Sequence, residues 1–215
     1  MWMTGCRLRI CESSPSLSSC FGGSGSGKHV ADCVERRWEN NKHIMSTSCE
    51  RIFYVPNDSD SELSDLRDAI QTIAEETHLD HRFILAVIMQ ESGGCVRVPT
   101  SDYGVRNPGL MQSHNGASTC NENGLLEPCP KDKIEGMIRD GTAGTDDGDG
   151  LVQCVNGSGA EDVSAYYRAA RCYNSGSVAE SGVLEEGVAT HCYASDVANR
   201  LLGWAETEKA CWLDG

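Results

Sequence analysis

Glu91 lies between an apolar stretch, Phe83 to Met89, and the glycine pair Gly93-Gly94. The apolar stretch predicts a buried helix that ends near this residue, where the carboxylate has little solvent and faces the negative end of the helix dipole. Both effects favour the neutral form of a carboxyl group and raise its pKa. A carboxyl group that stays partly protonated near neutral pH can act as a general acid. The alternative is that Glu91 is simply the first polar residue after a core helix.

Apolar residues at helical spacing predict the elements that place this carboxylate. Asp80 is suited to cap the helix that carries Glu91. Alternation with a period of two is nearly absent, so we expect a mainly α fold with at most a small sheet between Gly93 and Cys129. The predicted helices are residues 60–78, the helix after Asp80, a short helix through Ile134 that ends at Gly141, residues 163–173, and a last helix that is capped by Ser195 and leads to Trp204.

The length of the chain, 215 residues of which 39% are hydrophobic, is enough for one sizeable core. Residues 1–30 are rich in Ser, Gly and Cys, a composition that does not support a core and behaves as a flexible linker. We therefore expect an irregular N-terminal extension, residues 1–30, followed by a single domain, residues 31–215.

The charge of the chain excludes some partners. Eighteen basic residues against 32 acidic ones give a formal net charge of -14, which repels nucleic acids and anionic membrane surfaces. The longest wholly apolar stretch, Phe83 to Met89, is far shorter than the ~20 residues of a membrane-spanning helix. We expect a monomer that binds neither nucleic acid nor membrane.

The cysteine content predicts disulfides. Twelve cysteines are spread from Cys6 to Cys211, a pattern typical of proteins that fold in an oxidising compartment. None of them forms a CxxC pair, so we expect no metal site and no cofactor. The pairing cannot be assigned from the sequence. The first 30 residues contain no run of ~7 apolar residues such as a secretory signal needs, but the cysteines outweigh that absence and favour secretion.

Three short motifs follow one another along the chain: Glu91-Ser92, then Gly109-Leu110-Met111-Gln112, then Cys172-Tyr173-Asn174-Ser175-Gly176. Together they resemble the superfamily of goose-type lysozymes and soluble lytic transglycosylases, and the flanking sequence is most similar to a secreted fungal branch of it. The resemblance extends from about Cys33 to Trp204. It implies a lysozyme-like fold and an enzyme that cleaves a polysaccharide.

The resemblance also implies roles for these residues. Glu91 would be the catalytic acid, and the hydroxyl of Tyr173 would support it through a hydrogen bond. The amide of Gln112 offers both a donor and an acceptor for sugar hydroxyls or N-acetyl groups, and the glycines would let the backbone approach the sugar closely. The implied substrate-binding residues are Ser92, Gly109, Leu110, Met111, Gln112, Asn174 and Gly176, although packing is the more natural role for Met111.

A second carboxylate is less certain. An inverting hydrolase needs a base to activate water, and Asp102, in the loop before the Gly109 motif, is the best candidate. Members of the family often carry an aspartate two residues after the Gly-Leu-Met-Gln motif, where this chain has His114. Without that base, the hydroxyl of the sugar itself could close a 1,6-anhydro ring. Hydrolysis and transglycosylation therefore both stay open.

The resemblance thus implies an enzyme that cleaves the β-1,4 bond between N-acetylmuramic acid and N-acetylglucosamine in peptidoglycan. Chitin is an alternative substrate, because the same acid suits any polymer of N-acetylhexosamines. A further alternative is a glycan-binding protein without catalytic activity on a lysozyme scaffold.

Overall fold

The computed structural model describes residues 27–205 together with 211 and 213, and within them the fold is mainly helical, as the sequence predicts. Seven α-helices, one π-helical turn and one two-stranded hairpin make up this part of the chain. In order they are α1 (Gly27–Ser48), the π-helical turn η2 (Cys49–Phe53), α2 (Asp60–Thr77), α3 (His81–Glu91), β1 (Ser101–Asp102), β2 (Arg106–Asn107), α4 (Lys131–Ala143), α5 (Leu151–Asn156), α6 (Ser164–Ser175) and α7 (Tyr193–Leu201).

Predicted and observed helices agree best for α2 and α3, and less well elsewhere. The structure continues α4 beyond Gly141 to Ala143, begins α7 at Tyr193 instead of Ser195, and ends α7 before Trp204. The α1 helix begins at Gly27 and so overlaps the last four residues of the expected extension, residues 1–30. Residues 28–36 contain neither glycine nor proline, so nothing local interrupts a helix there. Residues 1–26 lie outside the described part.

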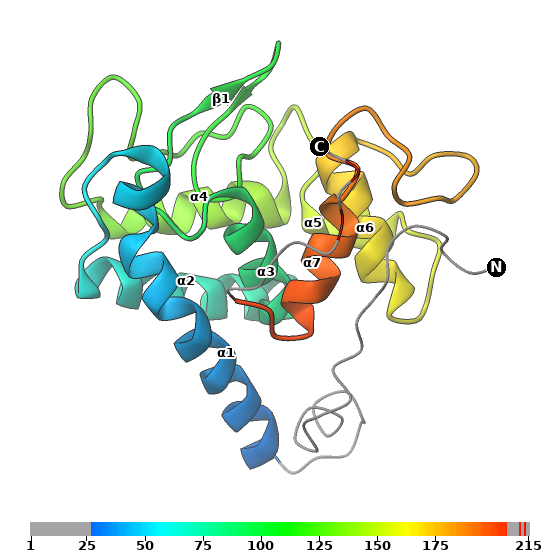
Figure 1. The fold of residues 1–215 in the computed structure, drawn as a ribbon, viewed down its shortest axis with the longest axis horizontal. Coiled ribbons are helices and arrows are strands. Elements are labelled where there is room, and N and C mark those ends of the chain that lie inside the picture. The colour runs from blue at the N-terminus through cyan, green and yellow to red at the C-terminus, as the bar shows by residue number, and fades with distance from the viewer. Residues whose placement is uncertain (1–26, 206–210, 212, 214–215) are drawn as a thin grey trace.

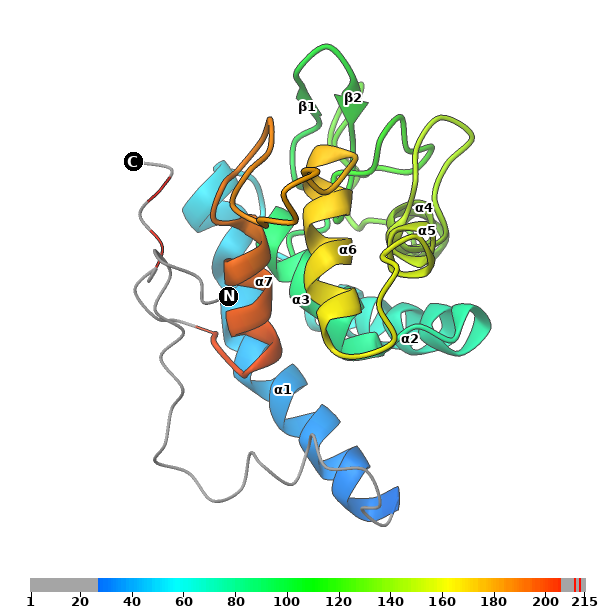
Figure 2. The same ribbon diagram turned by 90° about the vertical axis from the view of Figure 1, so that its right-hand side faces the viewer.

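The core helix α3 lies at the centre of the fold, with α2 and α4 packed against each other on one side and α6 and α7 on the other (Figures 1 and 2). The α7 helix packs against both α3 and α6. In both views the hairpin and the loop between α6 and α7 project from the same end of the molecule, toward which the C-terminal end of α3 points.

The sequence of α3 explains its position. Asp80 caps the helix as predicted, since its carboxylate accepts a hydrogen bond from the Arg82 amide at 2.9 Å. Every residue from Phe83 to Met89 is buried. The chain turns away directly after Glu91, because Gly93 and Gly94 adopt positive φ angles of 61° and 81°. A Cβ atom on Gly94 would lie 2.4 Å from Met45 Cγ, so α1 packs too closely there for any side chain.

A short hairpin is the sheet expected between Gly93 and Cys129. Strands β1 and β2 are antiparallel, with Ser101 opposite Asn107 and Asp102 opposite Arg106. None of the helices described between residues 27 and 205 combines the length and hydropathy that a bilayer-spanning helix needs.

Four disulfides close the described part of the chain, which agrees with the prediction from the cysteine content. They indicate a protein that folds in an oxidising, extracellular environment. One of them joins η2 to the turn after α3, one joins α5 to α6, and one ties down the start of α7. The pairs are Cys49–Cys95, Cys120–Cys129, Cys154–Cys172 and Cys192–Cys211.

A buried ionic cluster fixes the segment that follows Glu91. The Arg97 side chain is 1% exposed and donates hydrogen bonds to Asp58 Oδ1 at 3.1 Å, to Glu62 Oε1, and to the Leu126 carbonyl oxygen at 3.1 Å. Burial raises the pKa of Asp58 to about 7, although the Val96 amide and Arg97 oppose the shift. A buried carboxylate without its partner is costly, so Arg97 holds together three segments that are far apart in sequence.

We predict that Arg97→Met lowers the free energy of unfolding by about 3–5 kcal/mol, because two buried carboxyl groups lose their cation. Urea denaturation at pH 7 measures the loss. Arg139→Met is the matched control, since Arg139 also binds two carboxylates, Glu76 and Glu135, but is 41% exposed. That control should lose no more than about 1 kcal/mol. Equal losses in the two variants would contradict the structural role assigned to Arg97.

Candidate active site

Glu91, the last residue of α3, is the centre of the candidate site. Its side chain is partly buried, and the Tyr193 hydroxyl donates a hydrogen bond to its Oε1 atom at 2.5 Å. Burial raises the pKa of Glu91 to about 7, while the hydrogen bond from Tyr193 acts in the opposite direction. The carboxyl group is therefore about half protonated near neutral pH and is held in one orientation by its donor.

Tyr193 is a site residue that the sequence did not reveal. It is the first residue of α7 and is 2% exposed, and it reaches Glu91 because α7 packs against α3. Burial and the neighbouring Glu91 raise the pKa of Tyr193 well above its ordinary value, so the phenol keeps its proton. No motif marks Tyr193, and its place next to Cys192 is the one local signal that the start of α7 is fixed.

Tyr173, expected to support Glu91, donates its hydrogen bond elsewhere. Its hydroxyl binds the carbonyl oxygen of Met111 at 2.8 Å. Burial, with a further contribution from Glu91, raises its pKa, so the two side chains are close enough to interact electrostatically. The expected hydrogen bond between Tyr173 and Glu91 is therefore wrong, because α6 directs Tyr173 toward the Gly-Leu-Met-Gln segment while α7 supplies the donor to the carboxyl group.

The segment Gly109 to Gln112 is mostly core. Gly109 has a φ angle of 76°, and a Cβ atom on it would lie 2.6 Å from Met137 Cγ, so only glycine fits. Leu110 and Met111 are 0% exposed. Their side chains cannot line a cleft as expected, because the apolar core already encloses them.

Gln112 is the member of this segment that reaches the surface. It is partly exposed and adopts a φ angle of 48°. Its Nε2 atom donates to the carbonyl oxygens of Pro99 and Gly109 at 3.2 and 3.1 Å. These bonds fix the amide plane, so the side-chain oxygen is the atom it can offer to a ligand donor.

The other expected substrate contacts have mainly structural partners. Ser92 is 1% exposed, donates to the Ile88 carbonyl oxygen at 3.0 Å and accepts from the Gly94 amide at 3.2 Å. It therefore shapes the turn after Glu91 instead of facing a ligand. Asn174 is partly exposed and accepts a hydrogen bond from Arg171 at 3.1 Å. Gly176 is exposed and ends α6 in a left-handed conformation.

Asp102, the candidate base, lies on the hairpin. It is exposed, and its Oδ1 atom accepts a hydrogen bond from the Gly104 amide at 2.8 Å within the same turn. No carboxylate of the described residues contributes to the pKa of Glu91, which burial and Tyr193 determine. Among the described residues, neither a hydrogen bond nor an ion pair joins Asp102 to Glu91.

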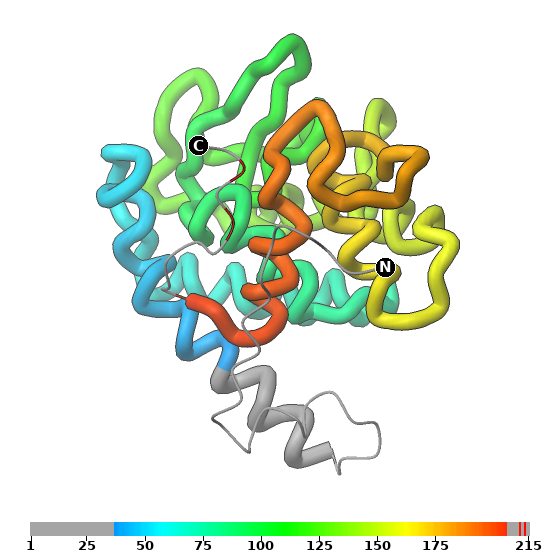
Figure 3. The backbone as a smooth tube through the Cα atoms, turned by 45° about the vertical axis from the view of Figure 1, so that its right-hand side comes forward, coloured from blue at the N-terminus to red at the C-terminus, as the bar shows by residue number. Residues whose placement is uncertain are grey.

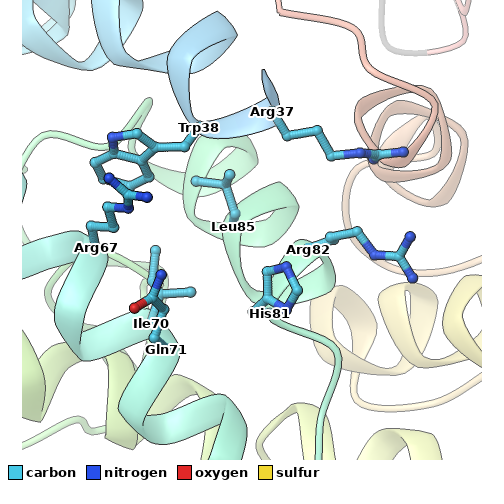
Figure 4. A pocket seen from close by; sticks show the side chains of 8 residues that line it. All are labelled: Arg37, Trp38, Arg67, Ile70, Gln71, His81, Arg82 and Leu85. Atoms are coloured by element: carbon cyan, nitrogen blue, oxygen red, sulfur yellow. The ribbon is translucent and has the colours of Figure 1, made fainter. Parts of the chain in front are cut away.

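A separate cavity lies at the other end of α3 (Figure 4). The guanidinium of Arg67 lies over the Trp38 ring, 5.9 Å from its centre. Arg37 donates to the Leu201 carbonyl oxygen and Arg82 pairs with Asp80, so both guanidinium groups already have partners outside the cavity. No carboxylate lines this cavity, and burial lowers the pKa of its one histidine, His81, so the ring favours the neutral form. Its lining residues are Arg37, Trp38, Arg67, Ile70, Gln71, His81, Arg82 and Leu85.

One group of possible metal ligands occurs among the described residues, formed by Cys49, Asp58 and Cys95. The two sulfur atoms are joined in a disulfide, so neither is a thiolate that could bind a metal. The Asp58 carboxylate belongs to the cluster around Arg97. The Asp58 carboxylate therefore lies near the disulfide because of how the chain packs, and the group is not a metal site.

Comparison with known proteins gives no relatives: no family profile, curated protein or solved structure matches this chain. The chemistry of the site must therefore be inferred from its own residues.

We predict that Glu91→Gln stabilises the protein at alkaline pH. The folded-state pKa of about 7 lies above the ordinary value of 4.5, so the stability due to the neutral carboxyl is complete below about pH 4.5 and is lost as the pH rises through 7. Urea denaturation should find the variant about 1–3 kcal/mol more stable than the native protein at pH 8, and nearly equal at pH 4. A difference that does not change with pH would contradict the raised pKa.

We predict that Tyr193→Phe raises the pKa of Glu91 above 7, because the hydrogen bond that favours the carboxylate is lost. Tyr173→Phe is the matched control, since it removes a hydroxyl that binds the Met111 carbonyl oxygen and leaves the donor to Glu91 in place. Carbon-13 NMR of the glutamate carboxyl groups, assigned with Glu91→Gln, gives both values. A larger change in the Tyr173 variant would assign the supporting role to Tyr173 after all.

Proposed function

We propose that this protein is a secreted glycosidase of lysozyme-like fold that cleaves the β-1,4 bond between N-acetylmuramic acid and N-acetylglucosamine in peptidoglycan. The observation that carries the proposal is the state of Glu91, a half-protonated carboxyl group with a fixed orientation at the end of a buried helix. Breaking a glycosidic bond requires such a group to protonate the leaving oxygen.

The spatial relation of the three motifs supports the proposal. Glu91 ends α3, Tyr173 interacts electrostatically with it, and the Tyr173 hydroxyl binds the backbone of Met111. Residues about 80 positions apart in the sequence thus meet at the end of α3. Gln112, the residue after Met111, carries a partly exposed amide. The four disulfides suit an enzyme that works outside the cell.

The reaction would begin with proton transfer from Glu91 to the oxygen of the β-1,4 bond. The bond between this oxygen and C1 breaks while the N-acetylmuramic acid ring develops oxocarbenium character. Two nucleophiles can then attack C1. Water gives a reducing end and needs a base for its proton, whereas the C6 hydroxyl of the same sugar gives a 1,6-anhydro ring and can return its proton to the Glu91 carboxylate.

The site favours the second route. The pKa of Glu91 carries no contribution from another carboxylate among the described residues, and Asp102 is exposed and bonded within its own turn. The position after the Gly109 motif where an aspartate could stand is occupied by His114. We therefore propose that a single carboxyl group acts first as acid and then as base, as in a lytic transglycosylase.

Two alternatives remain distinct from this proposal. Chitin is a rival substrate, because its β-1,4 bonds join N-acetylhexosamines that the same acid would protonate. A glycan-binding protein without activity is the rival from another class, and burial of Leu110 and Met111 is compatible with it. Glu91 is partly exposed and held by the Tyr193 hydroxyl, whereas Asp58, whose pKa is also raised to about 7, is enclosed in the cluster around Arg97; this difference favours the enzyme.

We predict that the purified protein clears suspensions of bacterial cell walls and that Glu91→Gln loses this activity by at least about 10²-fold, because the amide has no proton to give to the leaving oxygen. Activity should fall as the pH rises through 7, where Glu91 loses its proton. Asp102→Asn should retain activity. Mass spectrometry of the products should find 1,6-anhydro ends.

Each rival predicts another result. Reducing ends together with an inactive Asp102→Asn variant would indicate hydrolysis with Asp102 as base. Preferential cleavage of chitin oligosaccharides would change the substrate, and binding of glycans without cleavage would exclude the enzyme. Unchanged turnover by Glu91→Gln would refute the assignment of the acid.

A further inference from the structure

A buried arginine on α6 has no place in the proposed chemistry so far. Arg171 is 0% exposed. Its guanidinium donates to at least five neutral oxygen atoms: Leu184 O at 2.6 Å, Thr190 O at 2.8 Å, His191 O at 3.0 Å, Asn174 Oδ1 at 3.1 Å and Ser175 Oγ at 2.8 Å. Three of these are backbone carbonyl oxygens of the loop that joins α6 to α7.

The hydrogen bonds within this loop join residues that are close in sequence, such as Ser181 with Glu186 and His191 with Glu185. The loop runs from Gly176 to Cys192, contains no helix or strand, and is largely exposed, with Val188 95% exposed. Leu184 packs partly against the core, and the Cys192–Cys211 disulfide ties its end. Figure 3 follows the loop, in orange, from the end of α6 to the start of α7. Ordering so many residues is entropically unfavourable, and the three bonds from Arg171 to its carbonyl oxygens tie the loop to α6.

The contacts of Arg171 lead directly to Glu91. The Thr190 carbonyl oxygen that accepts from Arg171 also accepts from the Tyr193 amide at 3.2 Å. Tyr193 is the residue whose hydroxyl binds Glu91 Oε1. A continuous series of hydrogen bonds therefore runs from the guanidinium, through one backbone turn, to the carboxyl group.

We propose that Arg171 is a positioning residue for the general acid, and that it fixes the first turn of α7 so that the Tyr193 hydroxyl stays on Glu91. The planar guanidinium suits this role, because it donates in several fixed directions at once, whereas a lysine ammonium is a compact point charge on a flexible stem. The catalytic consequence rests on the function proposed above for Glu91, but the effect on the carboxyl group itself does not.

Arg171→Lys tests the proposal, because it keeps the positive charge and removes the fork that spans Leu184 and Thr190. We expect the pKa of Glu91 to rise by about half a pH unit or more, in the same direction as in Tyr193→Phe. The alkaline limb of the pH dependence of activity should move with it. The double variant with Tyr193→Phe should move no further than Tyr193→Phe alone, since both changes remove the same hydrogen bond. A merely structural arginine would lower stability and leave the pKa of Glu91 in place.

A second variant perturbs Arg171 from an exposed position and avoids a failure to fold. A Cβ atom on Gly187 would lie 3.0 Å from Arg171 Nη1 and 2.9 Å from Ser175 Oγ, so Gly187→Ala crowds the guanidinium without removing it. We expect a smaller rise in the pKa of Glu91. Val188→Ala is the matched control in the same loop, because this side chain is almost fully exposed, and it should leave the pKa unchanged.

Carbon-13 NMR titration of the Glu91 carboxyl group gives the decisive readout with or without a substrate. An unchanged pKa in folded Arg171→Lys would overturn the proposal, and so would an unchanged pKa in Gly187→Ala if the lysine variant does not fold. Absence of polysaccharide cleavage by the native protein would instead refute the proposed function, while the titration would still decide the role of Arg171.

Discussion

The site depends on a competition between burial and one hydrogen bond at Glu91. Burial at the end of α3 favours the neutral carboxyl, and the Tyr193 hydroxyl favours the carboxylate. The two effects together place the pKa near 7, where the group can both give and take a proton. With more burial, or without the hydrogen bond from Tyr193, the Glu91 carboxyl group would stay protonated at neutral pH. With less burial it would be an ordinary ionised carboxylate on the surface.

Two buried arginines fix the segments that adjoin Glu91 and Tyr193. Arg97 fixes the chain that follows Glu91 by binding Asp58, Glu62 and the Leu126 carbonyl oxygen. Arg171 fixes the chain that precedes Tyr193 by binding carbonyl oxygens of the loop before α7. Both segments are irregular, and a planar cation with several donors can satisfy the backbone of such a segment where helices and strands do not.

Disulfides complement these arginines. Cys49–Cys95 closes the turn after α3, and Cys192–Cys211 fixes the residue directly before Tyr193. In a protein with few strands and long loops, such covalent links restrict the unfolded chain and limit the motion of the folded loops. The two elements that carry Glu91 and Tyr193 are therefore each anchored by one disulfide and one buried arginine. A helical bundle with long loops can in this way keep two side chains within hydrogen-bonding distance.

The amino-acid sequence alone determined the helices whose apolar faces repeat locally, above all α2 and α3, as well as the disulfide-rich character and the unusual place of Glu91. These properties follow from neighbouring residues, because helix periodicity, capping by Asp80 and the break at Gly93-Gly94 act within a few positions. The sequence did not indicate which tyrosine binds Glu91. Tyr173 stands in a motif and Tyr193 in none, yet the packing of α7 on α3 gives the hydrogen bond to Tyr193, and the core encloses Leu110 and Met111. Contacts between helices about 100 residues apart depend on how those helices pack, so only the tertiary structure could decide them.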